Sequence, residues 1–155
     1  MISIAVIFSL SFALSHALDP CEVYTAVESR VQCGSEGYPL RYGWENCKRF
    51  QRSVRSGIFG RSGRRFVNST TICLVEAIDR IVEESPNIKC PEMTRAAFSS
   101  HVDCYVHAEF CWIAHEVAIG LLRTYKLTDF MSWVAMKQVL ETLRRCGISW
   151  LQSLS

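Results

Sequence analysis

Eight cysteines constrain what this chain of 155 residues can fold into more than any other feature. An even number of cysteines in a small domain is typical of extracellular proteins, whose thiols are oxidised to disulfides. The C-x-x-C spacing of zinc fingers and thioredoxin-like redox sites does not occur. We therefore predict that all eight are paired, and their spacing alone leaves the pairing open. They are Cys21, Cys33, Cys47, Cys73, Cys90, Cys104, Cys111 and Cys146.

An apolar segment precedes the first cysteine. Residues 2–14 are apolar or serine, and Ser15-His16-Ala17 has the small-x-small pattern that a signal peptidase recognises. The segment is shorter than the roughly 20 apolar residues that span a membrane, and no later segment runs that long without a charge. We predict a signal peptide over residues 1–17 and a secreted, unanchored chain that forms a single domain over residues 18–155.

The rest of the chain is patterned for helices, and strand-like alternation is nearly absent. Asp19-Pro20 is a helix-start signal, and it also argues against the alternative that the leader is a buried first helix. The recurrence of apolar residues three and four positions apart then predicts about five helices. They run from Pro20 to near Cys33, over residues 44–58, from the region of Asn68 to before Pro86, from Pro91 to His115, and from Thr128 or Asp129 to Cys146-Gly147. The expected fold is all-α, a helical bundle stapled by disulfides.

The fourth of these helices has the most informative pattern. Its stripe consists of Ala97, His101, Cys104, Ala108, Cys111 and His115. Since seven residues make about two turns, Cys104 and Cys111 are expected to point the same way and to bind partners on one side. This pattern predicts a central helix.

The histidines of this helix do not make a convincing metal site. His101 and His115 are fourteen residues apart, roughly 21 Å on a straight helix, so they cannot share an ion. His107, Cys111 and His115 have a better spacing, which fails if Cys111 is in a disulfide. Neither G-x-S-x-G nor H-E-x-x-H occurs. We predict no enzymatic activity, no metal and no cofactor.

Positive charge is concentrated in one stretch, although the net charge is only +2. No acidic residue lies between Glu45 and Glu76, where seven basic residues occur. They are Lys48, Arg49, Arg52, Arg55, Arg61, Arg64 and Arg65. Gly57, Gly60 and Gly63 predict a flexible basic loop after the second helix. We expect the basic segment from Lys48 to Arg65 to bind a heparan-type polyanion or a protein partner, and not nucleic acid if the chain is exported. Two alternatives stay open, a solvated helix flank and proteolytic processing at Arg64-Arg65.

Asn68-Ser69-Thr70 is an acceptor sequence for N-glycosylation. We place it where this loop enters the third helix, so Asn68 is expected to be exposed and modified in the secretory route.

From Cys47 to Cys146 the chain resembles the stanniocalcin family of secreted glycoprotein hormones. Phe59, Gly63, Arg64, Phe66, Val67, Thr70 and Cys73 fit the family's stretch F-x-x-x-G-[KR]-x-F-V-x-x-[ST]-x-x-C. Cys90, Cys104-Tyr105, Cys111 and Cys146 follow at the family's gaps of fourteen, seven and thirty-five residues. The resemblance implies a helical protein that acts on calcium and phosphate homeostasis through an extracellular protein or receptor partner. It also implies the pairs Cys21 to Cys47, Cys33 to Cys90, Cys73 to Cys104, and Cys111 to Cys146.

The chain departs from the family in several places. The gap from Cys33 to Cys47 is longer, an early cysteine pair is missing, and the sequon lies elsewhere. The family's further cysteine, which joins two subunits, is also missing, because the chain stops nine residues after Cys146. A covalent dimer is therefore not expected. A non-covalent homodimer stays open, since Trp133, Trp150, Leu151 and Leu154 offer apolar surface.

A rival interpretation is a secreted effector or toxin that acts on membranes or channels through basic and aromatic residues. An enzyme such as a degenerate phospholipase ranks third, with His101 as the residue to test.

Overall fold

The computed structural model describes residues 19–153, so the predicted signal peptide lies outside the described part of the chain. Within this range the elements are helical and no strand occurs. They are α2 (Glu22–Val31), the π-helix η1 (Tyr38–Trp44), α3 (Glu45–Arg55), α4 (Arg61–Glu84), α5 (Cys90–His107), α6 (Phe110–Thr124), the 3₁₀ turn η2 (Leu127–Phe130) and α7 (Trp133–Ser153). The prediction of an all-α, disulfide-stapled bundle is confirmed.

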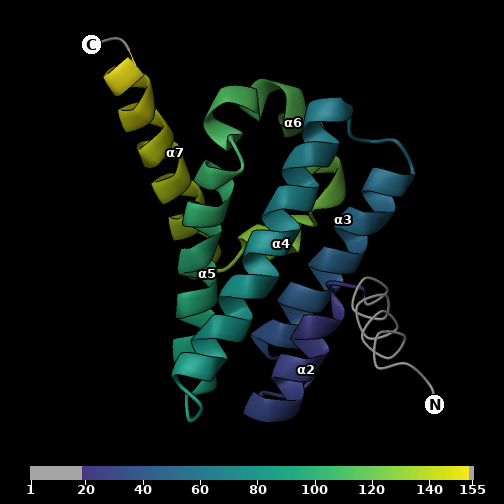
Figure 1. The fold of residues 1–155 in the computed structure, drawn as a ribbon, viewed down its shortest axis with the longest axis vertical. Helices are drawn as coiled ribbons and strands as arrows, with labels where there is room; N and C mark the ends of the chain where they lie inside the picture. The colour runs from purple at the N-terminus through teal and green to yellow at the C-terminus, as the bar shows by residue number, and fades with distance from the viewer. Residues whose placement is uncertain (1–18, 154–155) are drawn as a thin grey trace, which may run out of the picture.

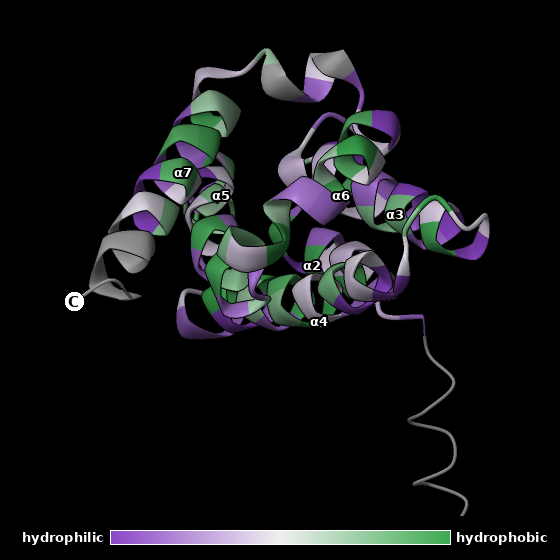
Figure 2. Ribbon diagram, turned by 90° about the horizontal axis from the view of Figure 1, so that it is seen from above, coloured by the Kyte–Doolittle hydropathy of each residue, from purple (hydrophilic) through white to green (hydrophobic). Residues whose placement is uncertain are grey.

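Helix α5 packs between α4 and α7 and makes the most extensive contacts of the bundle with these two helices (Figure 1). Seen from above, α5 and α7 lie on one side, α3 and α6 on the other, and α2 and α4 lie below them (Figure 2). One buried cluster joins α2, η1, α4 and α5 around Val27, Ile78 and Met93. A second cluster lies at the other end of α4 and α5, around Phe59, Phe66 and Val117. The core therefore consists of two clusters that lie one after the other along the α4–α5 pair.

Four disulfides staple this arrangement. They join Cys21 to Cys47, Cys33 to Cys90, Cys73 to Cys104, and Cys111 to Cys146, with Cα–Cα distances of 5.7, 5.7, 5.6 and 5.0 Å. No cysteine is free. These are the pairs that the family resemblance implies.

The prediction of one continuous helix from Pro91 to His115 is wrong. The first helix, α5, ends at His107, and Glu109 adopts a left-handed conformation with φ of +65° before α6 begins at Phe110. The break lets Cys104 reach α4 while Cys111 reaches α7. The two cysteines therefore serve partners on different helices, one on each side of a sharp turn.

The expected flexible loop up to Gly63 is also wrong, because α4 already begins at Arg61. Gly63 is buried in the first turns of α4, where the ring of Phe59 packs against it. A Cβ at this position would lie 2.9 Å from Cδ1 of Phe59. Glycine at this position lets the ring of Phe59 lie close to α4. The connection from α3 to α4 consists of residues 56–60 only.

The last helix differs at both ends from its predicted bounds. The side chain of Asp129 does not cap it but lies in η2, whereas the Ser132 hydroxyl accepts a hydrogen bond from the Ala135 N–H at 3.1 Å. The helix then runs past Gly147 to Ser153. It faces α5 with Ala135 and other small or polar residues, which leaves Trp133 largely exposed.

Gly120 supports a prediction about close packing between α6 and the α3–α4 connection. A Cβ on Gly120 would lie 2.4 Å from Cε1 of Phe59, whose ring is buried and has little room to move. We expect Gly120→Ala to lower the free energy of unfolding by roughly 1–3 kcal/mol, as measured by urea denaturation. Gly147→Ala is the matched control, because its added methyl group would have no atom within 4 Å beyond its chain neighbours and the nearby backbone of α7.

In that control the higher helix propensity of alanine should raise the free energy of unfolding by roughly 0.5–1 kcal/mol. A Gly120→Ala protein as stable as the parent would show that Phe59 is not fixed in its place.

Candidate functional site

The seven basic residues singled out in the sequence fall into two sets. Lys48 and Arg49 lie on the inner side of α3 and are held by acidic partners. The ammonium of Lys48 pairs with Asp19 and lies 2.7 Å from Glu22 Oε1. Hydrogen bonds to these two carboxylates raise the pKa of Lys48 above its usual value. Lys48 is thus committed to holding the start of α2 and does not contribute free charge to the surface.

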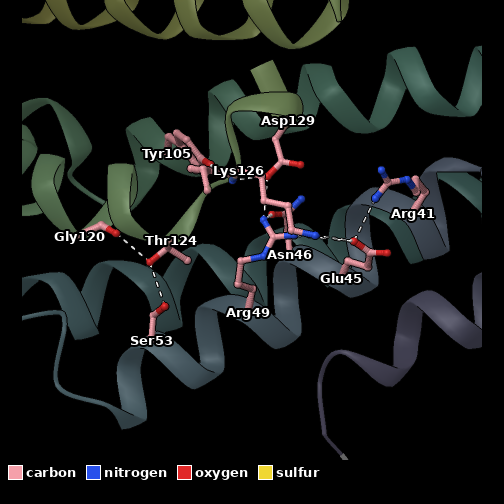
Figure 3. A network of polar contacts seen from close by, with 11 residues as sticks. Arg41, Glu45, Asn46, Arg49, Ser53, Tyr105, Gly120, Thr124, Lys126 and Asp129 are labelled. Carbon is pink, nitrogen blue, oxygen red and sulfur yellow. Dashed lines mark hydrogen bonds and ion pairs between the residues drawn. The ribbon is translucent and has the colours of Figure 1, made fainter. Parts of the chain in front are cut away.

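Arg49 is anchored more deeply than Lys48. Its guanidinium lies 2.8 Å from Asp129 Oδ2 and donates a 2.9 Å hydrogen bond to the Asn46 side chain (Figure 3). The backbone N–H of Lys126 donates to the same carboxylate at 2.8 Å. The inclusion of Lys48 and Arg49 in an exposed basic patch is therefore wrong, because both neutralise acids from distant parts of the chain.

The same network fixes α3 against α6. The hydroxyl of Thr124 lies 3.0 Å from that of Ser53 and donates to the Gly120 carbonyl at 2.7 Å (Figure 3). Glu45 adds a charged contact 3.1 Å from Arg41 on one side and one 3.8 Å from Lys126 on the other. These contacts hold the helix whose far end carries the exposed arginines.

The remaining five basic residues form what we call the arginine cluster. It consists of Arg52, Arg55, Arg61, Arg64 and Arg65, all exposed. The first two share a face of the last turns of α3, and the other three share a face at the start of α4, since residues three or four apart are neighbours on a helix. A connection of five residues, 56–60, brings the two helix ends to one end of the molecule (Figure 1).

Most of the charge in this cluster is not neutralised. Arg65 lies 3.5 Å from Glu109, in a contact that is exposed on both sides. Within the described part of the chain, the other four guanidinium groups have neither an ion pair nor a side-chain hydrogen bond. The first turn of α4 contains no acidic residue, although the positive end of the helix dipole favours acids there. Positive charge at this end of α4 is unfavourable for the isolated chain and suits an anionic partner.

Because α4 begins at Arg61, the expectations about processing at Arg64-Arg65 and about the position of Asn68 both change. Arg64-Arg65 lies in a helix, so the loop on which the processing alternative depends is not there. Asn68 is exposed, as expected, but lies within α4 and not where a loop enters a helix. Its modification stays a prediction.

The three histidines of the described range, His101, His107 and His115, do not assemble a metal site. His101 is buried between the rings of Tyr38, Tyr42, Phe98 and Tyr105, and its Nδ1 lies 2.8 Å from the Ala97 carbonyl. Burial lowers the pKa of His101 from 6.5 to about 4, so the ring is neutral near pH 7. Cys111 is in a disulfide. Across residues 19–153 no three His, Cys, Asp or Glu side chains are placed to share an ion.

Comparison with known proteins gives one finding. The family model described as the Stanniocalcin family matches residues 7–153, which is nearly the whole chain. No curated protein and no solved structure gives a significant match. Of the helices in the described range, none is both long enough and apolar enough to cross a membrane.

Proposed function

Since this chain belongs to the stanniocalcin family, we propose that it is a secreted, hormone-like glycoprotein that acts in calcium and phosphate homeostasis. It would do so by binding an extracellular protein or receptor, and no step of this function needs a reactive group. Family membership and four disulfides support an extracellular place of action, because such bonds persist in an oxidising compartment.

The observation that carries the binding proposal is the arginine cluster. Four exposed guanidinium groups without an acidic partner offer donors in the fork geometry that sulfate and carboxylate groups accept. A heparan-type polyanion presents sulfate and carboxylate groups along its chain, and an acidic face on a protein partner presents the carboxylates of Asp and Glu. We assign the cluster as the surface that attracts and orients either one.

A triple variant, Arg52→Glu, Arg61→Glu and Arg64→Glu, tests this assignment. Charge reversal should lower the affinity for heparin at least about tenfold near 0.15 M salt, a loss of about 1.4 kcal/mol. The protein should elute from a heparin column at lower salt, because fewer counterions are released on binding. The matched control is Arg80→Glu, Arg95→Glu and Arg123→Glu, which changes the net charge equally at exposed positions on α4, α5 and α6.

The control should stay on the column as the parent does. Equal losses in both variants would show a dependence on net charge alone and contradict a defined cluster. Applied to epithelial monolayers, the parent and the control should change calcium or phosphate transport, and the cluster variant should not. No effect of the parent protein on either ion would contradict the role in mineral balance.

A second candidate function, disruption of membranes, is favoured by one observation. Large apolar side chains are exposed on α6 and α7, namely Ile119, Leu122, Trp133, Leu140 and Leu143. Such a surface can insert into a bilayer next to basic residues. Leakage of anionic liposomes in the same series of proteins would favour this candidate over the hormone, and intact liposomes would count against it.

A further inference from the structure

A pocket of about 410 Å³ lies between α6 and α7. Its walls are apolar, with Ala118, Leu121 and Leu122 from α6 and Val139 and Leu143 from α7. Leu122 is 73% exposed, whereas Tyr105 from α5, which also lines the pocket, is 8% exposed. The pocket therefore has an open mouth between the two helices and an inner end against α5. Its volume falls within the roughly 300–1,000 Å³ of small-molecule sites.

The inner end is polar. The phenol oxygens of Tyr105 and Tyr125 form a hydrogen bond to each other, and the amide of Gln138 lies in the same lining. Burial raises the pKa of the Tyr105 phenol above its usual value, so this group stays a neutral donor and acceptor. The lining also includes Tyr42 and Thr142, and the Thr142 hydroxyl donates to the Gln138 carbonyl at 2.9 Å. A ligand with its hydrocarbon part between the helices therefore meets mostly apolar side chains before it reaches the two tyrosines.

A second, smaller cavity of about 50 Å³ lies behind the same tyrosines, since Tyr105 and Tyr125 line both. It contains two polar side chains, Asn46 and Thr70, that are each 6% exposed. The amide nitrogen of Asn46 and the hydroxyl of Thr70 have no partner within the protein. Buried polar groups of this kind are nearly always satisfied, so this chamber suits a small polar group or a few water molecules.

Charge selects among ligands. None of the described residues that line the two cavities is an acid, a lysine or an arginine, and His101 is neutral near pH 7. A carboxylate or phosphate would lose its hydration there without gaining a counter-charge, which is strongly unfavourable. An uncharged alcohol or ketone loses little, because the phenols and the amide replace its hydrogen bonds to water.

The walls are held at a fixed separation. The disulfide from Cys111 to Cys146 ties α6 to α7 at one end of the pocket, and the short η2 segment joins them at the other. An α-helix of a second protein is about 10 Å across and could place only a few side chains in this volume. The preformed, narrow shape with one polar end fits a small lipophilic molecule better than a protein segment.

We propose that the pocket between α6 and α7 binds an uncharged lipophilic molecule of sterol or retinoid size that carries one hydroxyl or carbonyl group. The polar group hydrogen-bonds at Tyr105, Tyr125 and Gln138, and the hydrocarbon part lies between Leu122 and Leu143. This site is separate from the arginine cluster and does not depend on it.

Retinol is a suitable probe because it is a neutral alcohol whose fluorescence rises in an apolar site, and retinoate is its charged counterpart. Titration of the purified full-length protein should show saturable binding of one retinol per chain, with retinoate bound at least about tenfold more weakly. Radiolabelled cholesterol in equilibrium dialysis provides a second neutral probe. Failure of both neutral probes to bind, or equal binding of retinol and retinoate, would overturn the proposal.

Three variants locate the bound molecule. Ala118→Trp fills the mouth from an exposed position and should abolish retinol binding, whereas Ile119→Trp, the next residue on α6 and outside the pocket, should not. Tyr125→Phe removes a hydrogen-bonding group at the inner end and should weaken retinol about tenfold, a loss typical of one such bond.

Circular dichroism of each variant checks that it is folded. Retinol binding that responds equally to Ala118→Trp and Ile119→Trp would indicate adsorption to the exposed apolar surface and overturn the assignment. A dimer in sedimentation velocity that Ala118→Trp dissociates would instead identify the pocket as an interface between two copies.

Discussion

Replacing Cys73 and Cys104 together by alanine is expected to lower the free energy of unfolding by about 4 kcal/mol. The bond closes a stretch of 31 residues, and chain-entropy arguments for a loop of this length give a loss of this order. It also connects α4 to α5, the pair along which both buried clusters lie. Urea denaturation followed by far-ultraviolet circular dichroism, without a reducing agent, measures the loss.

The variant with Cys33→Ala and Cys90→Ala is a sharp comparison, because that bond closes a longer stretch of 57 residues. Chain entropy alone would make its loss slightly the larger of the two. Cys104, however, is only 2% exposed, so its replacement also removes packed volume from the core. We expect the Cys73 and Cys104 variant to lose at least as much stability, and the reverse order would show that packing around Cys104 contributes little.

Acidification should destabilise the fold through His101. Because burial lowers its pKa to about 4 from an ordinary value of 6.5, the unfolded chain binds a proton at a pH where the folded protein does not. The contribution of His101 is complete above about pH 6.5 and is lost as the pH falls through 4. The free energy of unfolding should drop by about 2 kcal/mol between pH 7 and 5, and by about 3 kcal/mol at pH 4.

His101→Gln removes the titrating group while keeping an amide that can reach the Ala97 carbonyl. Its stability should be nearly independent of pH between 7 and 5. Asp19 and Glu141 also have pKa values below their usual ones, yet they titrate at more acid pH and do not affect this window. A His101→Gln protein with the same slope as the parent would assign the pH dependence to other groups.

The helical periodicity of the sequence predicted most of the helices but not where one of them breaks. Apolar residues keep their spacing through Ala108 and Cys111, so nothing in the pattern marks Glu109 as left-handed, a conformation more usual for glycine or asparagine. The break separates Cys104 from Cys111, whose disulfides lead to different helices. Their pairing came from the family resemblance, since spacing alone left it open.

Periodicity also identifies a stripe without saying which way it faces. Trp133, Met136, Leu140 and Leu143 recur as core residues do, yet they are exposed. The inner face of α7 instead uses Ala135, Gln138 and Thr142, whose small or polar side chains gave no signal of burial.

The arginine cluster was predictable in composition and not in extent. A run of basic residues without acids is visible in the sequence, but the acids that neutralise Lys48 and Arg49 lie up to 80 residues away. Such distant partners become apparent only once α3 is placed beside α2 and η2. What remains after this pairing, from Arg52 to Arg65, is the part of the run that faces solvent.

The ring of Phe59 makes the backbone under the arginine cluster rigid. It lies in the connection between α3 and α4, is almost wholly buried, and is enclosed by Gly63 on one side and Gly120 on the other. The glycines suggest a flexible segment, but the packing of Phe59 against two of them holds the connection in place. The backbone that carries the guanidinium groups on either side is therefore already ordered. When a polyanion binds, most of the conformational entropy that is lost is that of the polyanion.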